Sequence, residues 1–190
     1  VMTDDEKRLT AYHEAGLAIV GLHMPKTDPL HKVTIIPRGR ALGLTMQLPE
    51  RDKLSQSRTE IESLLAILYG GRVAEELIFG PENITTGAGS DIQRATDLAR
   101  RMVTEFGFSE KLGPLRYTDN QEEVFLGHSV TQSKNVSDAT AKLIDEEIRG
   151  LIDAAEDNAR RILKKHADDL EKIAQALLEY ETLTGKEVEA

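Results

Sequence analysis

His13 and Glu14 stand side by side in the segment 11–17, which reads Ala-Tyr-His-Glu-Ala-Gly-Leu. In the His-Glu-x-x-His pattern, two histidines four residues apart share one face of a helix and hold a zinc ion, and the glutamate activates a metal-bound water. Here Leu17 occupies the position of the second histidine, and its side chain offers no lone pair. The segment therefore predicts either a zinc site that lacks one ligand or a plain helix with His13 hydrogen-bonded in the core.

Asp91 is a second residue that could bind a metal. It lies within Ser-Asp-Ile-Gln, a capping pattern that predicts the start of a helix and places Asp91 in the first turn. The helix dipole favours a negative charge there, and a carboxylate so placed can act as a ligand, although the dipole alone ordinarily explains an acidic residue at this position. The neighbouring pair Glu75 and Glu76 either directs one carboxylate inward, toward the metal, or lies on a solvated helix face, which is the commoner arrangement.

Capping boxes mark the helices that must position these side chains. The Thr3–Glu6 box predicts a first helix from about Asp4 to about Leu22, and a similar pattern at Ser57–Glu60 predicts a second one. Gly16 inside the first helix costs about 1 kcal/mol relative to alanine, which indicates that another element packs closely against it. The pair Gly70–Gly71 indicates either close packing or a kink in the second helix rather than a phosphate-binding loop, because no strand precedes it and no Lys-Ser/Thr follows.

The segment 33–48 changes to a period of two, which predicts a β-hairpin in an otherwise helical chain. One of its strands must lie at a sheet edge, where it is either a structural flap or a docking edge for an extended peptide. The candidate substrate-binding residues on this hairpin are Val33, Thr34, Ile35, Leu42, Gly43, Leu44 and Thr45.

Apolar residues three and four apart in 143–163 and 170–178 predict two helices that form an αα-hairpin with a break near His166. We expect these apolar faces to form either core or a subunit interface. The segment 113–134 shows no helix or strand pattern apart from a short run near Val124, and we expect an irregular loop there.

Composition excludes several classes of function. The formal charge of −9 and the absence of a Lys/Arg run argue against nucleic acid as a partner. Without cysteine, neither a disulfide framework nor a Cys-type zinc site can form. The longest apolar run, near 18–22, is too short to span a bilayer, so we expect a soluble piece, and its abrupt start at Val1 suggests a domain excised from a longer chain.

Five motifs occur together and in order. They are Ala-Tyr-His-Glu-Ala-Gly at 11–16, Val-Thr-Ile-Ile-Pro-Arg-Gly at 33–39, Leu-Gly-x-Thr at 42–45, Tyr-Gly-Gly-Arg-x-Ala-Glu-Glu at 69–76, and Thr-Thr-Gly-Ala-x-x-Asp-x-x-x-Ala-Thr at 85–96. Together they resemble the zinc peptidase domain of the FtsH family of membrane-anchored AAA+ metalloproteases, over essentially the whole chain. The resemblance implies a mainly α-helical metallopeptidase domain with one small β-hairpin or sheet and a C-terminal αα-hairpin. Within 1–190 we expect catalytic helices and hairpin in 1–110, an irregular loop in 111–134 and C-terminal helices in 135–190.

By the same resemblance, the zinc ligands are His13, the residue at position 17 and Asp91, and Glu14 is the general base. The family implies a homo-hexamer that degrades unfolded and membrane proteins, with ATP used by an AAA+ module of the same polypeptide that this segment lacks. Membrane attachment is expected only through a missing N-terminal part. The parent protein is then expected in the bacterial inner membrane, or in an organellar one, with this domain on the cytoplasmic side.

Leu17 decides between two hypotheses. The first is a zinc endopeptidase domain that is inactive as written and binds zinc weakly or not at all. The second is a naturally inactive pseudo-peptidase that serves ring assembly or binding. Because every flanking motif residue is intact, the sequence favours a laboratory substitution that prevents self-digestion over natural decay.

Overall fold

The computed structural model describes residues 2–117, 124–125, 128–129 and 136–190. The chain forms two compact units, one of Val1–Ala95 with Asp153–Ala190 and the other of Thr96–Ile152. Most of the described chain is helical, as the sequence predicts, and the small sheet belongs to the first unit. All residues of the candidate site lie in that first unit.

Helices α1 (Asp4–His23) and α2 (Arg58–Phe79) begin where their caps predict. Thr3 Oγ1 accepts a hydrogen bond from the Glu6 amide, and the Glu6 carboxylate accepts one from the Thr3 amide, which completes a capping box. Ser57 caps α2 by accepting a hydrogen bond from the Glu60 amide. Helix α1 runs one residue beyond the expected Leu22, to His23.

Gly16 and Gly70 mark the point where α1 and α2 touch. A Cβ atom on Gly16 would overlap the carbonyl oxygen of Gly70, and a Cβ on Gly70 would lie 2.8 Å from the carbonyl oxygen of Gly16. The two backbones can approach this closely only because neither residue has a side chain. The close packing predicted at both glycines is therefore confirmed, and the two predictions describe a single contact.

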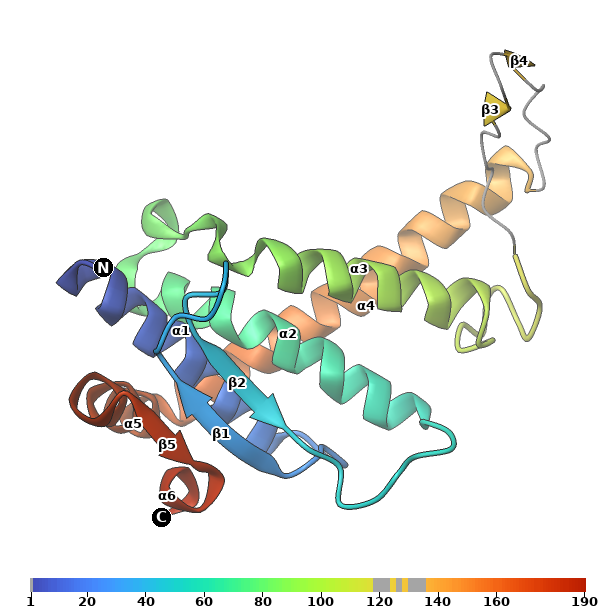
Figure 1. The fold of residues 1–190 in the computed structure, drawn as a ribbon. Helices are drawn as coiled ribbons and strands as arrows, with labels where there is room; N and C mark the ends of the chain where they lie inside the picture. Colours follow the sequence, from blue (N-terminus) through green and yellow to red (C-terminus); the bar gives the residue numbers. More distant parts are fainter. Residues whose placement is uncertain (1, 118–123, 126–127, 130–135) are drawn as a thin grey trace. The chain divides into compact units, whose positions relative to one another are not determined.

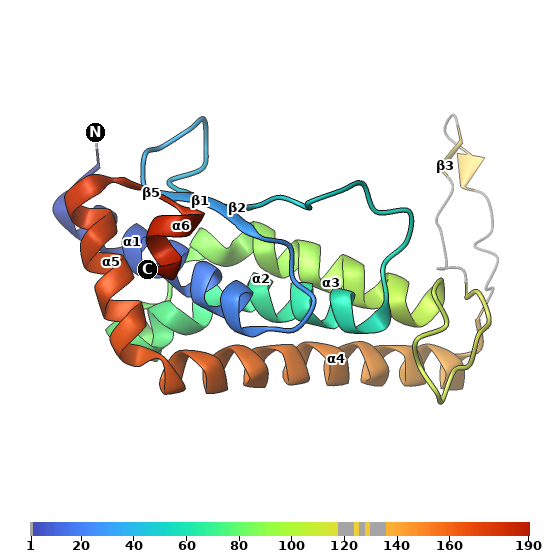
Figure 2. The same ribbon diagram turned by 90° about the horizontal axis from the view of Figure 1, so that it is seen from below.

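The sheet has three strands in the order β2–β1–β5, formed by β1 (Leu30–Thr34), β2 (Leu44–Gln47) and β5 (Thr182–Thr184). Both pairings are antiparallel, with Val33 opposite Thr45 on one side and Leu183 on the other. The sheet lies along one side of α1 (Figures 1 and 2). The predicted hairpin is thus present, but the C-terminal end of the chain supplies a third strand, which makes β1 the central one.

Helix α4 (Asp138–Lys165) ends and α5 (Ala167–Tyr180) begins on either side of His166, which confirms the two predicted helices and the break between them. Helix α5 packs against α1, where the hydroxyl of Tyr12 donates a 2.6 Å hydrogen bond to Glu171. A short helix, α6 (Gly185–Glu189), ends the chain. Most apolar residues of the two long helices are buried and form core: Ile144, Ile148, Ala155, Ala159, Ile162, Leu163, Leu170, Ile173, Ala174 and Leu177. Leu143, Leu151, Ile152 and Leu178 are half-buried.

Two single-turn helices, η1 (Pro81–Asn83) and η2 (Thr86–Ala88), lead into α3 (Gly89–Thr104). In the second unit the Ser109 hydroxyl donates a hydrogen bond to Glu147, and the two-residue strands β3 (Val124–Phe125) and β4 (His128–Ser129) pair with each other. Most of the loop expected over 111–134 lies outside the described residues. No helix in the described part of the chain is both long enough and apolar enough to cross a membrane.

Candidate metal centre

His13 lies on α1 between two carboxylates from other elements. Its Nδ1 atom is 2.7 Å from Oε2 of Glu75 on α2, and its Nε2 atom is 3.5 Å from Oδ2 of Asp91. Asp91 lies in the first turn of α3, as the capping pattern predicts, although this helix begins at Gly89, one residue before Ser90. Residues 78 positions apart in sequence therefore meet because the loop after α2 brings the start of α3 to the middle of α1.

Gly71 provides the space for the imidazole ring. A Cβ atom at this position would overlap Cε1 and Nε2 of His13, and it would lie 2.7 Å from Cδ2. Any side chain at position 71 would have to displace the ring. The two adjacent glycines therefore make two different close contacts. Gly70 lies against the α1 backbone, and Gly71 lies against the ring of His13.

Glu75 has no exposed surface, and both of its oxygens accept hydrogen bonds. Oε1 accepts from the amide and the hydroxyl of Thr85, at 3.0 and 2.7 Å, and Oε2 accepts from Nδ1 of His13. Burial opposes ionisation, but the hydrogen bonds from His13 and Thr85 outweigh it and lower the pKa of Glu75. An ionised Glu75 keeps the proton on Nδ1, so that Nε2 is the ring nitrogen that faces Asp91.

The inward position of Glu75 differs from the arrangement that the sequence favoured for the Glu75–Glu76 pair. Glu76 has the solvated position expected for such a pair, where it accepts a 2.8 Å hydrogen bond from Arg160. The spacing of α2 contains a signal for the difference, because Ile61, Leu68 and Glu75 follow one another at intervals of seven and all three are buried. Thr85 donates both hydrogen bonds to the other oxygen of Glu75. Apart from its place in the Thr-Thr-Gly-Ala motif, nothing in the sequence predicts this role.

Glu14 is buried beside His13, and Thr45 of β2 holds it in place. The Thr45 hydroxyl lies 2.6 Å from Oε2 of Glu14 and 3.0 Å from the Glu14 carbonyl oxygen, so it can donate to either. Burial raises the pKa of Glu14 above its ordinary value, although the positive charge of His13 and the Thr45 hydrogen bond oppose this. A carboxylate with a raised pKa and a fixed orientation is suited to act as a general base.

His13 binds a proton tightly in this arrangement. Burial alone would lower the pKa of the ring, but the hydrogen bonds with Asp91 and Glu75 and the negative charge of Glu14 outweigh burial and raise the pKa to about 10. Without a metal, the ring is therefore an imidazolium at neutral pH. A cation that binds Nε2 must displace this proton, and it would take over the role of the positive charge among the carboxylates.

The pair His13 and Asp91 fits a zinc ion. Zinc binds nitrogen and oxygen ligands at about 2.0–2.2 Å, so two ligands of a tetrahedral ion lie roughly 3.3–3.6 Å apart. The distance of 3.5 Å between Nε2 and Oδ2 falls in this range. However, no third His, Cys, Asp or Glu among the described residues completes a group with these two whose donor atoms all lie within 4.8 Å of one another.

Leu17 stands where the third ligand is expected. From Thr10 to Gly21 every residue of α1 is buried except Leu17, which is half-buried. The helix is thus open to solvent at this one position, one turn after His13. An apolar side chain there can neither bind a metal nor hold a water by a hydrogen bond.

The seven candidate substrate-binding residues do not share one position in the sheet. Val33 and Thr34 belong to β1, and Ile35 follows it, with its amide bonded to the carbonyl of Glu181. The backbone of this central strand pairs on both sides and offers no free edge. Leu44 and Thr45 belong to β2, which has no second neighbour among the described strands, and Leu42 and Gly43 precede it.

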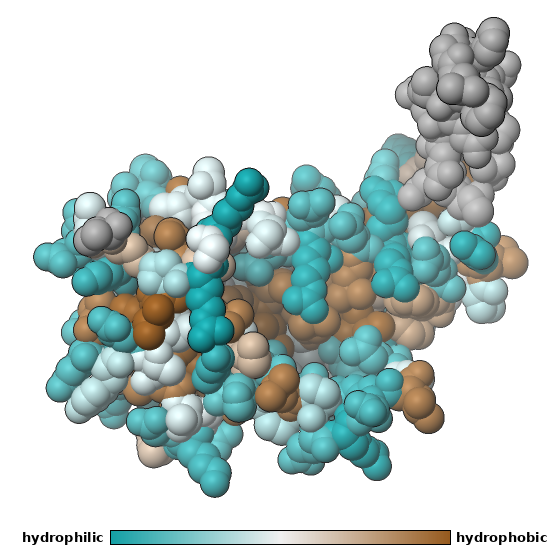
Figure 3. Space-filling view, in the orientation of Figure 1, coloured by the Kyte–Doolittle hydropathy of each residue, from teal (hydrophilic) through white to brown (hydrophobic). Residues whose placement is uncertain are grey.

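Exposed apolar side chains lie next to the ends of this hairpin's strands. Ile36, Leu42 and Leu48 are each close to half exposed and lie at the ends of β1 and β2. The face of the molecule that carries the sheet shows hydrophobic residues bordered by hydrophilic ones (Figure 3). A strand edge beside apolar residues and next to Glu14 is an arrangement that an extended peptide can join.

The sequence model of Peptidase family M41 matches residues 1–190. The chain is 60% identical over 187 residues to the ATP-dependent zinc metalloprotease FtsH of Caulobacter vibrioides, an alignment that covers 98% of this chain and 30% of that protein. For the proteins of the same name from Photobacterium profundum and Haemophilus influenzae, the identities are 56% over 189 residues and 54% over 188. These alignments cover 100% and 99% of this chain and 27% and 30% of the relatives, so the chain spans less than a third of their length.

Proposed function

Because this chain belongs to Peptidase family M41, we propose that it is the proteolytic part of an ATP-dependent zinc metalloendopeptidase, and that Leu17 leaves it inactive as written. The observation that carries the first statement is the 3.5 Å separation of His13 Nε2 and Asp91 Oδ2, which suits two ligands of one zinc ion. The second statement rests on the lack of a donor atom at position 17.

In this proposal Glu75 fixes the orientation of the His13 ring, and Asp91 supplies the carboxylate ligand. When bound, zinc supplies a Lewis acid that polarises a peptide carbonyl and acidifies a water. Glu14 would act as the general base, taking a proton from the attacking water and returning it to the leaving amine. Thr45 orients Glu14, so the water and the base meet only if β2 is in place.

The free edge of β2 is the proposed docking position for substrate. Main-chain pairing gives affinity without selecting particular side chains, as a protease for unfolded and membrane proteins requires. We restrict the proposal to Leu42, Gly43, Leu44 and Thr45, because Val33, Thr34 and Ile35 lie in or next to a strand that is paired on both sides.

The setting of the domain is proposed from the relatives rather than from this chain. Names that begin with "ATP-dependent" support an AAA+ module elsewhere in the same polypeptide, which would use the ATP. A homo-hexameric ring and a parent protein in the bacterial inner membrane, with this domain on the cytoplasmic side, belong to the same proposal. Since most apolar residues of α4 and α5 are buried, ring contacts would rest mainly on other surfaces.

The deciding experiment compares the chain as written with Leu17→His and, as a matched control, Leu17→Phe, which has a ring but no donor nitrogen. We expect stoichiometric zinc and chelator-sensitive casein cleavage only in Leu17→His, with zinc affinity lower by orders of magnitude in the other two. Chelator-sensitive cleavage by the chain as written, at the rate of Leu17→His, would contradict the ligand assignment.

The alternative function is a naturally inactive domain that serves ring assembly or binding, and the missing third donor favours it as much as it favours an inactivated enzyme. The same variants separate the two. A folded Leu17→His protein that binds zinc and still cleaves nothing would support the pseudo-peptidase, because then more than one residue of the machinery has been lost.

A further inference from the structure

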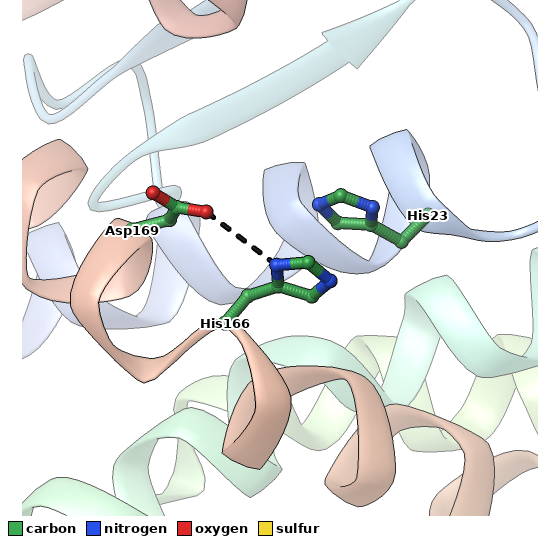
Figure 4. Close-up of side chains that lie close together, drawn as sticks. All are labelled: His23, His166 and Asp169. Carbon is green, nitrogen blue, oxygen red and sulfur yellow. Dashed lines mark ion pairs between the residues drawn. The ribbon is translucent and has the colours of Figure 1, made fainter.

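Away from His13, two histidines and an aspartate from distant parts of the chain meet at one place. His23 is the last residue of α1, His166 lies between α4 and α5, and Asp169 belongs to the first turn of α5 (Figure 4). Each offers a donor atom within 4.8 Å of the donor atoms of the other two. In the part of the chain that the structure describes, this is the only group of three His, Cys, Asp or Glu residues that meets this condition.

The distances within the group approach those of a metal site. His166 Nδ1 is 3.5 Å from Asp169 Oδ2, which again matches two ligands of a tetrahedral zinc ion. The rings of His23 and His166 are stacked, with centroids 3.7 Å apart and planes inclined by 6°. Because the lone pairs of stacked rings lie in parallel planes that are separated from each other, one ring must tilt to bind the same ion. His23 is exposed at a helix end, where such a rotation meets little resistance.

The chemistry of the donors selects the cation. Two imidazoles and one carboxylate suit zinc, whereas magnesium and calcium prefer all-oxygen sites. Since the group reaches solvent, water can supply the fourth ligand.

We propose that His23, His166 and Asp169 bind a second zinc ion, which clips the end of α1 to the corner between α4 and α5. Helices α1 and α5 already pack together in the first unit, so the ion would tie the end of the N-terminal helix to the start of α5. Its role is structural, because no carboxylate of the group is left free to act as a base. This inference does not depend on the proposed peptidase function.

The test is a zinc titration of the chain as written, followed by long-range ¹H–¹⁵N spectra of its five histidine rings. We expect one equivalent of zinc to move the ring signals of His23 and His166 and to leave that of His31 unchanged. His23→Ala should weaken zinc binding roughly tenfold or more, whereas His31→Ala, which alters an exposed histidine of β1, should have no effect. Asp91→Asn should retain this binding, which separates it from the candidate metal centre.

At saturating zinc the melting temperature should rise by about 5–10 °C, and this increase should disappear in both His23→Ala and Asp169→Asn. The use of two exposed positions keeps the test valid if either variant folds poorly. The proposal would be overturned if zinc moved only the ring signal of His13, or if His23→Ala bound zinc as tightly as the parent chain. The group would then be only a stacked pair of histidines with an ion pair between His166 and Asp169.

Discussion

The Nδ1 atom of His13 lies 2.7 Å from Oε2 of Glu75, a carboxylate with no exposed surface. This contact joins the middle of α1 to the second half of α2, and it determines which nitrogen of the ring is available to a metal. Glu75 is itself held by Thr85, at the end of the loop that delivers Asp91. The orientation of the ring and the position of the second ligand therefore depend on one buried side chain.

Replacing Glu75 by glutamine should damage the site while keeping its shape. A glutamine has one acceptor oxygen where Glu75 uses two, so its NH₂ group must face either Thr85 or Nδ1–H of His13. We expect a loss of about 1–3 kcal/mol in the free energy of unfolding. In the Leu17→His background, zinc affinity should fall about 10–100-fold.

Glu76→Gln is the matched control for this change. It alters the adjacent residue, whose ion pair with Arg160 is partly exposed and should contribute no more than about 1 kcal/mol. Chemical denaturation and zinc competition measure both effects. Equal losses in the two variants would show that the contact between Glu75 and His13 has no special role.

The metal-free protein should lose stability as the pH rises from about 6.5 to about 10. The pKa of His13 is about 10 in the folded chain and about 6.5 when unfolded, so the folded state binds the proton more tightly. This contribution is complete below pH 6.5 and is lost as the pH rises through 10. Urea denaturation with a chelator present measures it, and the decline should be smaller in Glu75→Gln. A stability that is constant or increases over this interval would contradict the assignment.

Gly71→Ala should destabilise the protein although alanine favours helices. Its Cβ would overlap the His13 ring, and we expect a net loss of about 1–3 kcal/mol together with weaker zinc binding in the Leu17→His background. Gly150→Ala in α4 is the control, because no atom lies within 4 Å of the new Cβ, and it should stabilise the protein by about 0.5–1 kcal/mol. Thermal melts of both variants should therefore shift in opposite directions, and shifts of the same sign would refute the proposed contact.

The docking edge can be tested at Gln47. The Leu48 amide donates to Pro29 on the β1 side, and since amides alternate along a strand, that of Gln47 should face the free edge. In the Leu17→His background, Gln47→Pro should raise KM for an unfolded substrate roughly 3–10-fold relative to Gln47→Ala, with little change in kcat. Both variants remove the side chain, and only proline removes the N–H. Identical KM values would exclude main-chain pairing at this position.

The sequence alone was sufficient where the determinants are local. Helix caps at Thr3 and Ser57 predicted where α1 and α2 begin, because a cap involves residues three positions apart. A period of two predicted strands near Thr34 and Leu44, and the first-turn position of Asp91 followed from its capping pattern. Glycines inside helices predicted close packing without identifying the partner.

Tertiary structure alone decided what the buried carboxylate of Glu75 contacts. Intervals of seven from Ile61 through Leu68 place Glu75 on the buried face of α2, but only the packing of α2 against α1 brings it to His13, while Glu76 pairs with Arg160. Tertiary structure also decided that the strand at Thr182–Thr184 pairs with β1, because the two segments lie near opposite ends of the sequence. The meeting of His23 with His166 was decided in the same way, because contacts between distant residues depend on how whole elements pack and leave no periodic signal in the sequence.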